Sequence, residues 1–202
     1  MGKIISFEGI HGCGKSTQAK LTYSNLLCRG YDVKQISSKD KDLSKYAMAF
    51  LEENGEQDAE VLFYLALAND FILNRKFVEN PDGIFILDRY IHTNMASTYA
   101  AGKNKDWILD CVKPFRMPDI TFLVDLSPDE AYKRKGSRVN EIEEGKLQKG
   151  HSDVGFINYQ ERIRKAYLEF AKNDPKIVLL DGAKSISECN EEIVKSLEDI
   201  LR

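Results

Sequence analysis

The 202-residue chain has few cysteines, and they form no pattern. The four of them, Cys13, Cys28, Cys111 and Cys189, are scattered and include no C-x-x-C pair. Structural zinc sites and disulfide frameworks need clustered or regularly spaced cysteines. We therefore expect neither kind of site, and we interpret the four side chains as reduced thiols of a cytoplasmic protein.

Long apolar runs and an excess of positive charge are also missing. No stretch is long and apolar enough for a membrane span, and the N-terminus leads directly into a short apolar run rather than a signal peptide. The 29 Lys and Arg residues are outnumbered by 32 Asp and Glu residues, which gives a net charge of −3. We expect no membrane partner and no nucleic-acid partner. The length fits a single domain over residues 1–202.

Short apolar runs alternate with longer segments of helical periodicity. The predicted strands are Lys3–Phe7, Val33–Ser37, Ile84–Asp88, Ile120–Asp125 and Ile177–Asp181. The predicted helices are Ser16–Arg29, Leu43–Glu53, Ala59–Asn80, His92–Ala101, Asp106–Val112, Pro128–Lys135, Gly155–Asn173 and Ile186–Leu201. This alternation predicts an α/β fold whose parallel sheet is covered by helices on both faces. Ligands of such sheets bind at the carboxyl ends of the strands, where Glu8, Asp88, Arg89 and Asp125 fall.

The segment "FEGIHGCGKST" carries the pattern G-x-x-x-x-G-K-[ST] between a predicted strand and a predicted helix. In such a loop, successive backbone N–H groups and the helix N-terminus bind phosphate, Lys15 reaches the β- and γ-phosphates, and Ser16 binds Mg²⁺. The alternative is a glycine-rich turn before an ordinary helix. The expected nucleotide-binding residues are Gly9, Ile10, His11, Gly12, Cys13, Gly14, Lys15, Ser16 and Thr17.

A second group of polar residues follows the apolar strand "IFIL", where Asp88 and Arg89 are adjacent. A carboxylate after a strand beside a phosphate-binding loop is a common partner of Mg²⁺. An arginine fork binds phosphate through two hydrogen bonds. The alternative is a surface ion pair. Together with the loop, the pair indicates phosphoryl transfer, which needs alignment and positive charge more than a general base.

The segment of residues 136–153 is polar and contains Arg138, two lysines and three glycines. Its position between two helices of a phosphate-binding domain favours a lid that closes over ATP. The alternative is a solvated surface loop.

The motifs taken together resemble the thymidylate kinases, and the resemblance runs nearly end to end. It is carried in order by "FEGIHGCGKSTQ", "DAEVLFYLALAND", "DRYIHTNMAS", "MPDITFLVDLSPDEAYKR", "INYQERIRKAYLEFA" and "LLDGAKSI". The resemblance implies a P-loop NTPase-type fold with a five-stranded parallel sheet. It also implies Mg²⁺-dependent transfer of phosphate from ATP to dTMP, and a homodimer.

By position, the resemblance implies roles for individual side chains. It implies that Lys15, Arg89 and Arg138 are catalytic, with Arg134 and Lys135 as alternatives to Arg138 because Gly12 leaves no arginine in the loop. Ser16 and Asp88 are the implied Mg²⁺ residues. The implied acceptor-binding residues are Tyr64, Arg89, Thr93, Asn94 and Ser97, with Tyr64 stacking on the base and Asn94 contacting its edge.

Several positions depart from the family pattern, and all of them concern the acceptor. His11 stands where an acidic residue is usual, Ala68 where an arginine meets the thymine carbonyl, and Ser97 where a tyrosine excludes a 2′-hydroxyl. The Arg-Glu-Pro-Gly motif after the second strand is missing. A kinase for a different nucleoside monophosphate is therefore a rival hypothesis.

A rival from another class is a GTP-dependent switch or nucleotide-binding module. Its guanine-reading motif Asn-Lys-x-Asp would match "NKDW" at residues 104–107 only in the first two places, which disfavours it. Outside the proposed site, we expect His92 and His151 at the surface or at helix ends, and Trp107 in packing.

Overall fold

The computed structural model describes residues 2–37, 58–136, 153–172 and 174–201. Within these ranges, five parallel strands form one sheet in the order β2-β3-β1-β4-β5. The strands are β1 (Ile4–Glu8), β2 (Val33–Ser37), β3 (Ile84–Asp88), β4 (Ile120–Asp125) and β5 (Ile177–Asp181). The predicted α/β fold with a five-stranded parallel sheet is confirmed, with β1 starting one residue later than expected.

The helices also follow the predicted pattern, with ends that differ by up to three residues. They are α1 (Lys15–Cys28), α3 (Ala59–Glu79), α4 (Ile91–Ala100), α5 (Lys105–Val112), α6 (Pro128–Lys135), α7 (Asp153–Ala171) and α8 (Ile186–Glu198). The predicted helix Leu43–Glu53 lies outside the described residues, as do Arg138, His151 and residues 137–152 of the predicted lid.

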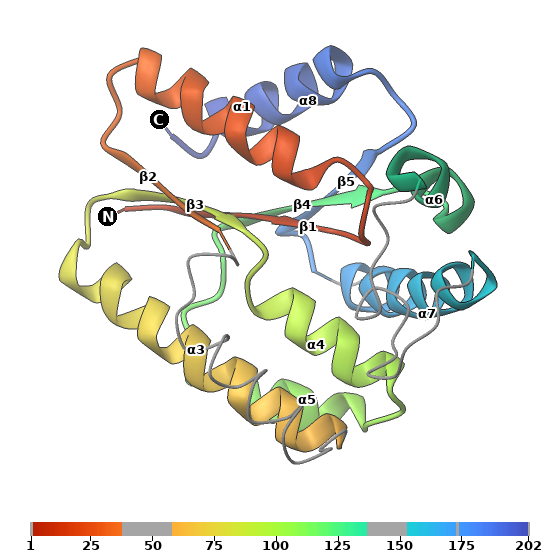
Figure 1. Cartoon of the computed structure of the whole chain (residues 1–202). Coiled ribbons are helices and arrows are strands. Elements are labelled where there is room, and N and C mark those ends of the chain that lie inside the picture. The colour runs from red at the N-terminus through yellow and green to blue at the C-terminus, as the bar shows by residue number, and fades with distance from the viewer. Residues whose placement is uncertain (1, 38–57, 137–152, 173, 202) are drawn as a thin grey trace.

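Helices cover both faces of the sheet (Figure 1). Helices α1 and α8 lie together on one face, and α3, α4, α5 and α7 lie on the other, with α6 beside α7. Successive side chains of a strand point to opposite faces. Accordingly, Phe85 of β3 packs in a cluster with Phe63 and Phe77 of α3, whereas Ile86 belongs to the cluster that includes Leu26 of α1.

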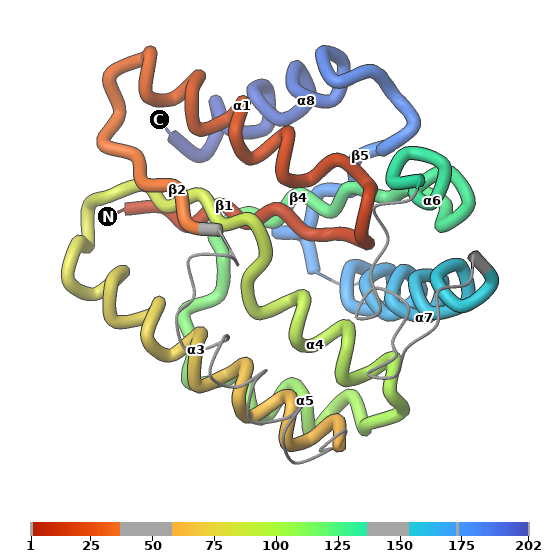
Figure 2. Tube along the Cα trace, in the orientation of Figure 1, coloured from red at the N-terminus to blue at the C-terminus, as the bar shows by residue number. Residues whose placement is uncertain are grey.

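The parallel arrangement gathers the polar strand ends at one edge of the sheet. The register pairs Phe7 with Asp88, Glu8 with Leu123, and Asp125 with Asp181. The turn after β1 lies next to α6 (Figures 1 and 2), where a Cβ atom at Gly12 would lie 2.8 Å from the carbonyl oxygen of Ala131. This edge therefore holds the glycine-rich loop and the acidic strand ends that the sequence predicts to act together.

Candidate functional site

The glycine-rich turn between β1 and α1 has a backbone that few other residues can adopt. Gly9, Gly12 and Gly14 have φ angles of 136°, 84° and 107°. A Cβ atom at Gly9 would lie 2.6 Å from the carbonyl oxygen of Val124, so this position also lacks room for a side chain. Gly14 is the N-cap of α1 and offers no side-chain cap, which leaves the first N–H groups of the helix for a ligand.

Lys15 is held inside this turn. Its side chain is buried, and its Nζ donates a hydrogen bond of 3.0 Å to the carbonyl oxygen of Ile10. Burial, and after it the positive charge of Arg89, lower the pKa of Lys15 to about 8. The electrostatic attraction between an ammonium and a phosphate is stronger when the ammonium is poorly solvated than when it is hydrated.

A cavity of about 560 Å³ opens beside the turn. Its lining combines the loop and the start of α1 with α6 and the segment before α8: Gly12, Cys13, Gly14, Lys15, Ser16, Thr17, Gln18, Val124, Arg134, Lys135, Gly182, Lys184, Ser185, Ile186 and Cys189. Four of these side chains are cationic, which suits a polyanionic ligand. Lys184 lies in the segment "LLDGAKSI" but is not among the nucleotide-binding residues expected from the sequence.

Glu8 organises the second half of the site. Its buried carboxylate accepts hydrogen bonds from Ser6 Oγ and the backbone N–H of Tyr90, both at 2.8 Å. It also accepts one from Thr93 Oγ1 at 2.6 Å and one from the hydroxyl of Tyr167 at 3.1 Å. Burial, and then the charge of Glu8, raise the pKa of Tyr167. One carboxylate thus joins β1, α4 and α7.

Arg89 is bonded to this network through one of its two terminal nitrogens. Its Nη1 donates to Thr93 Oγ1 at 3.1 Å and to the Tyr167 hydroxyl at 3.4 Å. Its Nη2 is buried and, within the described ranges, has no hydrogen-bond partner; the same holds for Oδ1 of Asp88. Arg89 also has a φ of 73°, which a side-chain-bearing residue seldom adopts. Unsatisfied buried polar atoms beside a strained residue indicate a site completed by a ligand.

A second cavity, of about 330 Å³, lies between α3, α4 and α7. It is lined by Ala59, Leu62, Phe63, Ala66, Asn94, Ser97, Thr98, Ala100, Ala101, Tyr159 and Arg162. Its walls are mainly apolar, with a small number of polar side chains. That composition suits a flat, partly polar molecule such as a nucleobase.

Comparisons with known proteins agree with this geometry. The family model described as thymidylate kinase matches residues 7–193. The chain belongs to the thymidylate kinase family.

A probable thymidylate kinase from Sulfolobus acidocaldarius is 35% identical over 190 residues, which cover 94% of this chain and 93% of that protein. Another probable thymidylate kinase, from Sulfurisphaera tokodaii, is 30% identical over 204 residues, which cover 100% of this chain and 99% of that protein. Among solved structures, a thymidylate kinase from Candida albicans matches with a TM-score of 0.75 and 25% identity, over 98% of this chain and 92% of that one.

Of the predicted site residues, Gly12 to Thr17 line the first cavity, and Asn94 and Ser97 line the second. Arg89 and Thr93, which belong to the polar network around Glu8, line neither cavity, and nor does Asp88 next to Arg89. Tyr64 and Ala68 also line neither cavity. Tyr64 is 53% exposed and packs edge-on against Trp107. Ala68 is exposed, so the residue of α3 that faces the cavity near this position is Ala66. Trp107 is a packing residue, as predicted.

Of the two places expected for His92, the structure shows the helix end and not the surface. It lies buried in the first turn of α4, with Nδ1 3.4 Å from Thr121 Oγ1. Burial lowers the pKa of His92, which favours the neutral imidazole. Tyr90 and Ile91 beside it are fully buried, which explains why this helix end does not reach the surface.

Two further residues of the predicted site have structural partners. The backbone N–H of His11 donates to Gln160 Oε1 at 3.1 Å, which ties the loop to α7. Asp125, one of the charged strand ends, forms a two-bonded ion pair with Arg164 at 2.6 and 2.8 Å. The four cysteines are free thiols in the structure, and Cys13 is buried.

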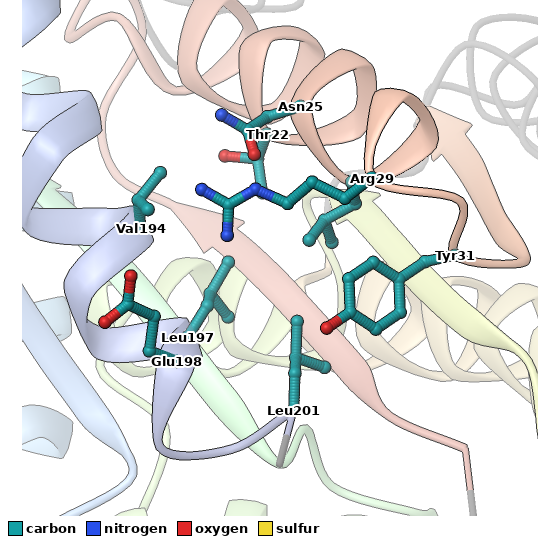
Figure 3. Close-up of a pocket in the computed structure, with 9 residues that line it drawn as sticks. Thr22, Asn25, Arg29, Tyr31, Val194, Leu197, Glu198 and Leu201 are labelled. Atoms are coloured by element: carbon teal, nitrogen blue, oxygen red, sulfur yellow. The ribbon is translucent and has the colours of Figure 1, made fainter.

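A third cavity, of about 220 Å³, lies between α1 and α8 on the other face of the sheet (Figure 3). Leu26, Leu197 and Leu201 contribute apolar walls, and Arg29 extends across it. The buried hydroxyl of Thr22 borders this cavity and, among the described residues, has no hydrogen-bond partner.

Proposed function

We propose that the chain transfers the γ-phosphoryl group of ATP to dTMP, giving ADP and dTDP. The observation that carries the proposal is the buried Nη2 of Arg89, next to Lys15 and Asp88, for which the described part of the chain supplies no hydrogen-bond partner. A guanidinium with one nitrogen anchored and one free is suited to grip the phosphate of the acceptor. The names of the relatives support the choice of dTMP.

In this proposal the cavity beside the glycine-rich turn binds ATP. The cavity between α3, α4 and α7 binds dTMP and is called the acceptor cavity below. Lys15, the N–H groups at the start of α1, and Lys184 would hold the phosphates of ATP, while Arg89 would hold the acceptor phosphate. Because the acceptor oxygen is already anionic, no general base is required. The residues act by alignment and by fixed positive charge.

Mg²⁺ would be held by Ser16 and Asp88 together with ATP oxygens. Within the described ranges, no group of three His, Cys, Asp or Glu side chains is placed to bind a metal. Mg²⁺ in kinases commonly uses one or two protein ligands plus phosphates and water, so Ser16 and Asp88 fit this requirement. When bound, Mg²⁺ would neutralise charge developing on the phosphates. Arg138 and a lid over ATP remain predictions.

ADP release from Mg·ATP with a panel of acceptors tests the function: dTMP, dUMP, UMP, CMP, dCMP, AMP and GMP. Preference for dTMP would support the proposal, and preference for another acceptor would favour the rival kinase. Slow GTP hydrolysis without acceptor dependence would favour the switch. Arg89→Lys should raise the KM for the acceptor, because an ammonium cannot replace the anchored fork.

We also infer a homodimer that acts in the cytoplasm. Tyr64, Phe71 and Val78 are exposed and lie seven residues apart, so they form one apolar stripe along α3. An exposed apolar stripe on a helix is suited to a second copy of the chain. The four free cysteines fit a reducing compartment. None of the helices in the described ranges combines the length and apolar composition needed to span a bilayer.

A further inference from the structure

Asn94 is a polar group of the acceptor cavity with an unusual partner behind it. Its Nδ2 donates a hydrogen bond of 2.7 Å to Oδ2 of Asp70, which is fully buried on α3. No described residue donates a hydrogen bond to Oδ1 of Asn94. The amide therefore meets the protein through its nitrogen and leaves its oxygen for a ligand in the cavity.

The carboxylate of Asp70 decides this orientation. The oxygen and nitrogen of an asparagine amide occupy nearly the same space, so shape alone does not select one orientation. An ionised carboxylate only accepts hydrogen bonds, and it would repel the amide oxygen. Asp70 therefore favours the arrangement in which Nδ2 points toward α3.

Asp70 is itself held in a fixed place. Its backbone carbonyl accepts a hydrogen bond of 3.3 Å from Nδ2 of Asn74. That amide also donates to the hydroxyl of Tyr90 at 2.6 Å, while its oxygen accepts from the N–H of Arg116 at 2.9 Å. These contacts anchor the turn of α3 that carries Asp70 to the start of α4 and to the segment before β4.

We propose that Asp70 is a positioning residue that selects the acceptor base by holding the oxygen of Asn94 toward the cavity. This inference rests on the proposed kinase function and specifies its substrate class: pyrimidines that carry a ring N–H at position 3. The N3–H of thymine or uracil donates to that oxygen. Cytosine has a lone pair at N3, which would face the lone pairs of Asn94.

The test compares kcat/KM for dTMP, dUMP and dCMP in the native enzyme and in Asp70→Asn. An asparagine at position 70 can donate or accept, so the amide of Asn94 can turn and present its nitrogen to cytosine. We expect the native enzyme to prefer dTMP over dCMP by about 100-fold or more, since a polar mismatch in a buried site is strongly rejected. We expect Asp70→Asn to reduce that ratio at least about tenfold, with an absolute gain for dCMP.

Asp110→Asn is the matched control, because it removes an equal charge from an exposed residue of α5 that pairs with Lys113. An equal loss with dTMP and dCMP in Asp70→Asn would overturn the inference and leave Asp70 a packing role. Efficient use of dCMP by the native enzyme would also overturn it.

Calorimetric binding of dTMP and of its N3-methylated form to the native protein needs no variant. Binding of the methylated form within threefold of dTMP would overturn the inference even if Asp70→Asn failed to fold. Absence of turnover with every acceptor, accompanied by a binding preference for dTMP, would instead refute the proposed function alone.

Discussion

Glu8 shows how one carboxylate can hold a site together. It accepts four hydrogen bonds, and two of their donors, Thr93 and Tyr167, also contact Arg89. The acceptor-binding arginine is therefore placed by residues from α4 and α7 that meet at the end of β1. Loss of the Glu8 charge should disturb both the fold and the site.

We expect Glu8→Gln to lower the free energy of unfolding by about 2 kcal/mol, because an amide donor would then face groups that are themselves donors. The KM for the acceptor should rise as well, since Arg89 loses its fixed partners. Urea denaturation and steady-state kinetics measure the two effects. Glu79→Gln, in an exposed pair with Arg75, serves as the control and should change little. Unchanged stability would show that the network contributes little.

The lowered pKa of Lys15 predicts a pH dependence. Below about pH 8 its amine is protonated in the free enzyme and can bind phosphate; above that value the charge is lost. We expect kcat/KM for ATP to fall about tenfold per pH unit above this point. The fall in kcat should begin at a higher pH, because bound phosphate stabilises the ammonium.

Lys15→Arg keeps its charge over this range and should give a flat profile at lower activity. A native profile that stays level up to pH 9.5 would contradict the assignment of Lys15.

The site could be predicted from the sequence only where its residues are close together along the chain. The loop from Gly9 to Thr17 and the pair Asp88–Arg89 are local patterns, and the structure places them at one edge as expected. The contact between Glu8 and Tyr167 joins positions 159 residues apart, and no local pattern reports it. The alternation along β1 does place Glu8 on the same face as Ser6, which is a usable signal.

At the scale of single elements, strands were predicted more accurately than helix ends. Four of the five strands match because each is a short apolar run with clear limits. Helix α8 ends at Glu198 rather than Leu201, since periodicity alone does not show where hydrogen bonding stops. The misplacement of Tyr64 and Ala68 on α3 has a related cause, because the helix is apolar on several sides.

Helix α1 contains a buried hydroxyl that weakens it. Thr22 Oγ1 has no partner among the described residues and borders the cavity toward α8 (Figure 3). We expect Thr22→Val, which replaces the hydroxyl by a methyl group of similar size, to raise the free energy of unfolding by about 1 kcal/mol. Thermal and urea unfolding measure the change. Thr22→Ser keeps the hydroxyl and should destabilise; a destabilised Thr22→Val would show that the hydroxyl is satisfied in solution.

At the scale of the whole molecule, the apolar stripe on α3 predicts self-association. Phe71 is 60% exposed and Val78 is 76% exposed. We expect Phe71→Glu to convert the proposed dimer into a monomer, because a charge would be buried at the contact. Sedimentation velocity measures the change. Leu179→Glu, at an exposed position of β5, is the control and should leave the native state of assembly unchanged; a Phe71→Glu protein that still sediments as a dimer would place the interface elsewhere.

The two chain ends share one side of the molecule. Gly2 donates a backbone hydrogen bond to Pro81 just before β3, and Leu201 borders the same cavity as Tyr31 just before β2 (Figure 1). Both lie at the amino edge of the sheet, opposite the edge with the glycine-rich turn. Anchoring the protein to a sensor surface through either end would therefore orient the nucleotide cavities toward solution, where substrates could reach them without obstruction.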